Sequence, residues 1–171
     1  FLQHGFRTLT SFVTRDLRMQ IKHDLHVLQC CQERQQVMGL KNESDFSTQA
    51  NQIIVALNIE AVAEALLFAA RNGADPAKVR QAIMGGFASS RILELHAERM
   101  INGTFNPGFR IRLHQKDLNL ALQGAKALGV ALPNTATAQE LFNTCAANGF
   151  GKADHSALCR AIEIMSNHDI A

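Results

Sequence analysis

Two pairs of adjacent side chains in this 171-residue chain could support acid–base chemistry. Asp154 precedes His155, and Lys116 precedes Asp117. A histidine that is oriented by a carboxylate can move protons near neutral pH. Neighbours in sequence point to different faces of a helix, however, so neither pair forms a dyad by itself. We therefore interpret Asp154 and His155 as a helix cap, and Lys116 with Asp117 as a solvated pair unless a wider pattern gives Lys116 a role.

The other reactive side chains form no catalytic or metal-binding pattern. Ser89 and Ser90 follow two glycines, where a helix N-terminus would favour an anion, but simple capping explains them equally well. His96, His114 and His155 lie on different predicted helices at no metal-ligand spacing. We expect these histidines to be surface or packing residues, and we predict no metal site.

Composition narrows the class of protein further. Seventeen basic against fifteen acidic residues leave a formal charge of +2, with no basic run, which disfavours a nucleic-acid partner. The four cysteines include no C-x-x-C and indicate reduced thiols, with Cys145 and Cys159 packed on apolar helix faces. Asn58, Glu60 and Glu64 interrupt the most apolar stretch, so no membrane span is expected. A cytoplasmic location is predicted.

From about residue 49 onward the sequence predicts helices alone. Apolar residues recur at helical spacing, and capping residues, glycines and prolines separate the periodic segments. The helices are expected at about 49–71, 76–84, 89–100, 111–129, 134–148 and 154–166. Because no strand-like alternation occurs among them, the expected fold class is all-α, a helical bundle.

The first of these helices is apolar over most of its circumference. One face carries Ala50, Ile54, Leu57, Ala61, Ala65 and Phe68, and another carries Ile53, Ala56, Ile59, Ala63 and Leu67. Such a helix belongs in the middle of a bundle, where it would span roughly 35 Å at about 1.5 Å per residue.

Residues 1–48 have a different character from the rest. They contain no proline and show neither strand alternation nor more than a patchy helical period. We predict a ragged helix or disorder over 1–48, and a separate helical domain over 49–171.

Four segments together resemble a known family. They are NQIIVALNIEAVAEALLFAARNGADP (51–76), GGFASSRILELHAERM (85–100), FNPGFRIRLHQKDLNLALQGAKALGVALPNTATAQELFNTCAANGFG (105–151) and DHSAL (154–158). They are similar to the C-terminal helical domain of the β-hydroxyacid dehydrogenases, the group of 3-hydroxyisobutyrate and 6-phosphogluconate dehydrogenases. The resemblance covers about residues 49–171 and implies their helical bundle with a long first helix.

The resemblance implies an NAD(P)H-dependent oxidoreductase that interconverts a small β-hydroxy acid and its aldehyde, here D-glycerate and tartronate semialdehyde. In that family a Rossmann domain precedes the helical domain, and the subunits form homo-oligomers. By the same resemblance, Asn51, Gln52, Ser89 and Ser90 would contact the substrate, and Lys116 would contact the cofactor across the interdomain cleft.

The resemblance stops at the catalytic lysine, because that position is occupied by Thr48. A threonine hydroxyl donates a hydrogen bond but does not ionise usefully near neutral pH. No G-x-G-x-x-G motif is present, and 48 residues are too few for a Rossmann domain. We expect no intact catalytic residue, no useful NAD(P)H binding and no turnover by this chain alone.

Two origins of residues 1–48 remain open, a frameshifted or wrongly assembled reading frame and a natural helical extension. Two functions also remain open. The chain is either the helical substrate-binding and dimerisation domain of a reductase or a non-catalytic helical oligomerisation module. Because the long first helix would lack its usual cover, both functions predict self-association.

Overall fold

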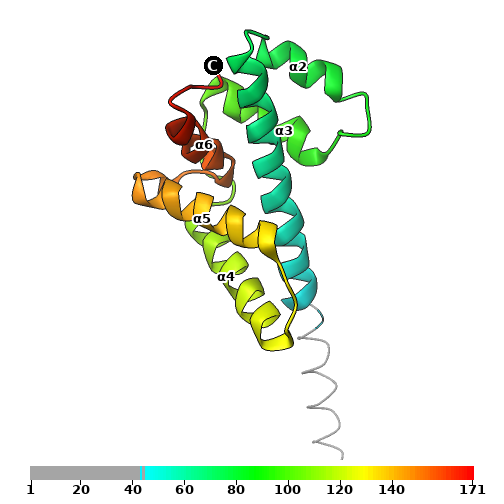
Figure 1. The fold of residues 1–171 in the computed structure, drawn as a ribbon, viewed down its shortest axis with the longest axis vertical. Helices are drawn as coiled ribbons and strands as arrows, with labels where there is room; N and C mark the ends of the chain where they lie inside the picture. The colour runs from blue at the N-terminus through cyan, green and yellow to red at the C-terminus, as the bar shows by residue number, and fades with distance from the viewer. Residues whose placement is uncertain (1–42, 44) are drawn as a thin grey trace, which may run out of the picture. The chain divides into compact units, whose positions relative to one another are not determined.

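The computed structural model describes residue 43 and residues 45–171 (Figure 1). Within that range Ser47–Ala171 forms one compact unit. The expectation of a ragged helix or disorder over residues 1–48 lies almost entirely outside the described residues. The division into 1–48 and 49–171 therefore stays a prediction.

The described residues are helical and contain no strand, only one isolated antiparallel bridge between Arg110 and Asp154. The predicted all-α class is confirmed. In chain order the elements are the long helix Asp45–Arg71, α2 (Pro76–Ile83), α3 (Arg91–Asn102), α4 (Ile111–Leu128), α5 (Pro133–Ala147), the 3₁₀ helices η1 (Phe150–Lys152) and η2 (His155–Leu158), and α6 (Cys159–Ser166).

Local capping residues set most of these boundaries. The Asp75 carboxylate accepts two backbone N–H bonds at the start of α2, whose first residue is Pro76. Ser90 accepts one such bond at the start of α3. Gly103 and Gly129 close α3 and α4 with φ angles of 61° and 68°, a left-handed conformation that favours glycine. These ends lie within a residue or two of where the sequence predicts them.

Two boundaries differ from the prediction. The long helix begins no later than Asp45, because helical conformation extends upstream of the predicted start at residue 49. The last helix does not run unbroken from 154. The Asp154 side chain accepts the N–H of Ser156 and starts the 3₁₀ turn η2, whose four residues are all buried, and α6 begins only at Cys159. The tight turn places His155 inside the molecule.

The long helix packs along one face only. Ala56, Ile59, Ala63 and Leu67 lie in the core, whereas the other predicted apolar face remains uncovered, with Ile54 63% and Phe68 74% exposed. The expectation that this helix lies in the middle of a bundle is therefore wrong for the described part of the chain. The physical reason is that no element among residues 45–171 covers the second face, where Ala61 and Ala65 are exposed as well.

By length and composition alone, the helix Asp45–Arg71 could cross a membrane. The polar residues Asn58, Glu60 and Glu64 are too few to exclude this, contrary to the expectation from sequence. The same test is passed by core helices of soluble proteins, and this helix contributes Ile59, Leu66 and other residues to the hydrophobic core. Its apolar character is thus weak evidence for a membrane.

The C-terminal helices form the remainder of the core. α4 and α5 lie side by side and contact each other, and α6 packs against α5 (Figure 1). Phe142 on α5 and Leu118 on α4 are completely buried. Cys145 and Cys159 are buried free thiols, as predicted, and burial raises the pKa of Cys145 to about 11. A thiol with so high a pKa is a packing residue and a poor nucleophile.

Candidate functional site

Gln52 and Lys116 are brought together through Asp117. The Gln52 side-chain amide donates a hydrogen bond of 2.9 Å to Asp117 Oδ2, and Lys116 Nζ lies 3.4 Å from Asp117 Oδ1. Gln52 comes from the long helix and the other two from the first turns of α4, far apart in sequence. Asp117 therefore orients an amide with one oxygen and a cation with the other, and we name these three residues the Gln52–Lys116 cluster.

Within this cluster only Lys116 is open to solvent, because Gln52 is buried and the Asp117 side chain is 17% exposed. The Lys116 side chain is 66% exposed, and two depressions along α6, the larger about 590 Å³, are lined by other residues. Asn51, one residue before Gln52, is exposed, as is Thr48 one turn earlier. Such an arrangement can offer the Lys116 ammonium to an anionic ligand, whereas the Gln52 amide is buried and bonded to Asp117.

The serines predicted to bind substrate are not joined to this cluster. The Ser90 hydroxyl accepts the N–H of Leu93 as the α3 cap, and Ser89 is exposed with its N–H donated to Gly86. Within residues 45–171, no hydrogen bond links either serine to the Gln52–Lys116 cluster. Capping is thus a sufficient account of Ser90, and a substrate-binding role for the two serines stays a prediction.

The described residues do not fit a complete dinucleotide. The four glycines with positive φ, at positions 73, 103, 129 and 149, follow the C-terminal ends of helices. None of them stands between a strand and a helix N-terminus, where backbone N–H groups would hold a pyrophosphate. Lys116 could touch a cofactor held by another domain, but residues 45–171 provide no cradle for the phosphates.

Three histidines form a buried cluster that reasoning from the sequence missed. His96 comes from α3, His114 from α4 and His155 from η2, and their ring centroids lie 4.7–5.1 Å apart in the two contacting pairs. His114 Nε2 lies 3.0 Å from the backbone oxygen of Gln52, which connects the cluster to the long helix. The expectation of packing residues is right for the two buried rings, His114 and His155. Their mutual hydrogen bonds were not anticipated.

Asp154 is the most heavily bonded acid beside that cluster. Its oxygens accept the N–H groups of Gly108, Phe109 and Ser156 and the Ser156 hydroxyl, and Arg99 lies 3.0 Å away. Burial alone would raise the pKa of Asp154, but the hydrogen bonds from Ser156, Phe109 and Gly108 lower it to about 2. Asp154 is the predicted cap, and it also fastens the 108–109 loop to η2.

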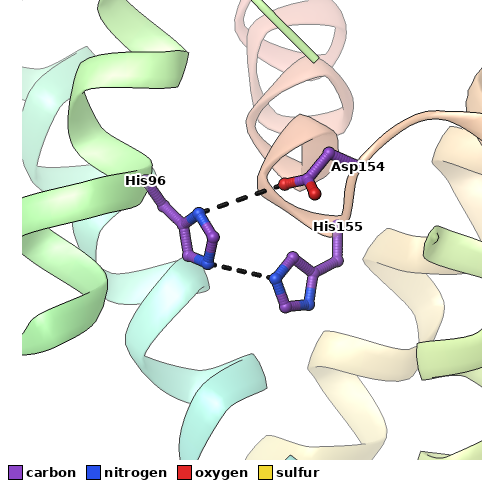
Figure 2. Close-up of side chains that lie close together, drawn as sticks. All are labelled: His96, Asp154 and His155. Atoms are coloured by element: carbon purple, nitrogen blue, oxygen red, sulfur yellow. Dashed lines mark hydrogen bonds and ion pairs between the residues drawn. The ribbon is translucent and has the colours of Figure 1, made fainter. Parts of the chain in front are cut away.

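His96, Asp154 and His155 also place possible metal-ligand atoms within 4.8 Å of one another (Figure 2). The two imidazole Nε2 atoms, however, bond each other at 3.0 Å. Both Asp154 oxygens already accept hydrogen bonds, and the Arg99 guanidinium repels a cation there. The arrangement is that of a hydrogen-bonded network.

Comparison with known proteins identifies the class to which this fold and cluster belong. Residues 48–162 match the family described as NAD-binding of NADP-dependent 3-hydroxyisobutyrate dehydrogenase. The chain belongs to this family of NAD(P)-dependent hydroxyacid dehydrogenases.

Particular relatives carry reductase and dehydrogenase names. The chain is 76% identical over 135 residues to 2-hydroxy-3-oxopropionate reductase of Escherichia coli K12, covering 79% of this chain and 46% of the relative. It is 35% identical over 130 residues to a probable mitochondrial 3-hydroxyisobutyrate dehydrogenase-like protein of Arabidopsis thaliana, covering 76% and 39%. A crystal structure of 3-hydroxyisobutyrate dehydrogenase from Salmonella typhimurium superposes with a TM-score of 0.65 at 29% identity, covering 67% and 40%.

The chain spans less than half the length of these relatives. The 135 residues matched to the E. coli protein exceed the number between Gln49 and Ala171, so that match also takes in residues before Gln49.

Proposed function

We propose that this chain is the helical half of an NAD(P)H-dependent reductase that converts tartronate semialdehyde (2-hydroxy-3-oxopropionate) to D-glycerate, and that it is inactive without a nucleotide-binding half. The 76% identity to the E. coli reductase carries the proposal. The Gln52–Lys116 cluster supports it, because Asp117 holds the exposed Lys116 ammonium beside the buried Gln52 amide, where the ammonium can contact an anionic ligand.

In the proposed complete site the cofactor supplies hydride, and this chain supplies binding groups. Asn51 and Gln52 would hold the substrate, with Ser89 and Ser90 as further candidates at the α3 terminus. Lys116 would contact the cofactor, held in place by the Asp117 carboxylate. A proton donor is absent at Thr48, since its hydroxyl does not ionise usefully.

The test is a hybrid that joins residues 49–171 to the nucleotide-binding half of the E. coli reductase, with lysine at position 48. We expect the hybrid to oxidise NADH with tartronate semialdehyde, and the natural chain, even as Thr48→Lys, to show no turnover. In the hybrid, Lys116→Ala should raise the KM for NADH roughly 10- to 100-fold, the usual effect of losing one charged hydrogen bond.

Lys126→Ala provides the matched control, because Lys126 is exposed on the same helix but lies in its last turn. Its kinetics should equal those of the unaltered hybrid. An inactive but folded hybrid would contradict the proposed reaction. NADH oxidation by the natural chain would contradict the proposed inactivity.

The alternative is a non-catalytic helical oligomerisation module. It is favoured by the uncovered face of the long helix, where Ile54 and Phe68 stand exposed near opposite ends. Large exposed apolar faces mark association sites. We also propose that the reductase is a homo-oligomer. Because both proposed functions then predict self-association, only the hybrid assay distinguishes between them.

Self-association through this face is a prediction in its own right. The purified chain should sediment as an oligomer, and the double variant Ile54→Glu/Phe68→Glu should shift it to monomer, because two buried carboxylates would oppose the contact. Phe87→Glu is the control, since Phe87 is fully exposed in the α2–α3 connection. Equal sedimentation of all three proteins would rule out this face as the interface.

We further propose a cytoplasmic location and a small β-hydroxy acid or its aldehyde as the ligand, without a nucleic-acid or membrane partner. The free thiols Cys145 and Cys159 are compatible with a reducing compartment.

A further inference from the structure

The three buried histidines are linked end to end by hydrogen bonds of 3.0 Å. His114 Nε2 faces the Gln52 carbonyl oxygen, His114 Nδ1 faces His155 Nδ1, and His155 Nε2 faces His96 Nε2. Each contact joins groups from elements far apart in the chain. Together they connect α3, η2 and α4 to the Gln52 turn of the long helix.

The carbonyl at one end sets the position of every proton. A carbonyl oxygen only accepts, so His114 Nε2 carries a proton, and in a neutral ring His114 Nδ1 then has none. His155 Nδ1 must therefore donate to it, which leaves His155 Nε2 as the acceptor of a proton on His96 Nε2. With all three rings neutral, only this order makes all three hydrogen bonds.

The row of hydrogen-bonded histidines ends at a nitrogen without a hydrogen-bond partner, His96 Nδ1. In the same order His96 Nδ1 carries no proton, and it is buried without a hydrogen-bond partner. Asp154 Oδ1 lies 4.0 Å away, as Figure 2 shows, so a bare lone pair faces a carboxylate. A proton at this nitrogen would turn a weak repulsion into an ion pair.

The three hydrogen-bonded histidines can take up one proton without losing a hydrogen bond. A proton on His96 Nδ1 leaves the three bonds unchanged, and shifting the bridging protons moves the charge to His155 or His114 with every bond retained. A second added proton would force two N–H groups to face each other. The network is therefore ordered from Gln52 to Asp154 and has room for a single added proton.

We propose that His114, His155 and His96 form a proton-ordered clamp that positions the Gln52 turn, and that protons enter it at His96 Nδ1 beside Asp154. His114 is the positioning residue that contacts the turn, and the other two rings hold His114 in the required tautomer. The clamp does not depend on the proposed reductase activity.

The charged groups facing the clamp are Asp154, Arg99 and Asp117. Burial lowers the pKa of all three histidines, and for His155, with help from the neighbouring rings, to about 3. Because the folded protein then binds fewer protons than the unfolded chain below pH 6.5, the stability from the clamp is complete above that pH. It decreases as the pH falls from 6.5 toward 3.

The test is ¹⁵N NMR of the histidine-labelled full chain. At pH 7 we expect His114 and His96 as Nε2–H tautomers and His155 as the Nδ1–H tautomer, with all three rings neutral. Any other tautomer order, or a cationic ring in the cluster at pH 7, would overturn the proposal. Single variants at each position assign the signals.

A second measurement tests the positioning role. His114→Phe keeps an aromatic ring but removes the bond to Gln52, and amide exchange around Gln52 should accelerate about tenfold. His168→Gln is the matched control and should leave that exchange unchanged. Unaltered exchange in His114→Phe would overturn the positioning role. If that variant does not fold, the tautomers of the natural chain still decide the proton order. Loss of the His96 and His155 N–H signals on adding Zn²⁺ alone would show a metal site instead.

Discussion

Replacing Asp154 with alanine is expected to lower the free energy of unfolding by about 3–5 kcal/mol. The carboxylate is almost wholly buried and accepts four hydrogen bonds, and it pairs with Arg99. Its loss leaves the part-buried N–H groups of Gly108 and Phe109 and the buried N–H of Ser156 without acceptors. Urea unfolding of the natural chain and the variant at pH 7 measures the difference.

Asp75→Ala is the control for this substitution, since Asp75 also caps a helix but is exposed on α2. It should cost only about 1 kcal/mol. Equal effects of the two substitutions would show that Asp154 acts as a cap and nothing more.

Asp154 also predicts an acid-sensitive contribution to stability. Its pKa is about 2 in the folded chain against an ordinary value of 3.8, so its contribution is complete above about pH 4 and is lost as the pH falls toward 2. Asp154→Asn should therefore show a smaller change in urea midpoint between pH 4 and pH 2 than the natural chain.

Replacing Phe142 with alanine is expected to cost roughly 3–5 kcal/mol, the usual cost of a cavity left by a buried aromatic ring. Phe142 is completely buried on α5, and its ring centroid lies 4.8 Å from that of His114. The cavity would thus open between the core and the histidine clamp. Thermal unfolding should show a drop of several degrees, at about 2–4 °C for each kcal/mol.

Phe87→Ala gives the matched comparison, because Phe87 is fully exposed. Its effect on stability should stay within about 0.5 kcal/mol. A small effect at Phe142, similar to that at Phe87, would mean that the α4–α5 core repacks freely. Such a result would also weaken the case for a rigid clamp, since the His114 ring packs against the Phe142 ring.

The sequence predicts a helix end correctly where the residues that produce that end are close to it in the chain. Asp75 with Pro76, Ser90, Gly103 and Gly129 each act on the backbone within a few residues, and the structure has helix ends at all of them. The last helix was misjudged at its start. Its 3₁₀ turn depends on Asp154 bonding Gly108 and Phe109 of a distant loop, which no local pattern reveals.

The candidate site was readable in part. The resemblance singled out Gln52 and Lys116, but only the structure shows that Asp117 joins them. The sequence does contain one indication that His114 of the histidine clamp is buried. His114 shares the spacing of the buried residues Ile111, Leu118 and Ala121 on α4, a position that points to the core. Helical period can predict that a histidine is inside, but not which partners it meets there.

The sequence by itself determined the helical class, most helix ends and membership of the dehydrogenase family, because periodicity, capping and motif spacing are properties of neighbouring residues. Tertiary structure alone decided that one face of the long helix stays uncovered and that His96, His114 and His155 meet around Asp154. Those facts depend on which helices pack together, since contacts between residues separated by 40 or more positions leave no local trace.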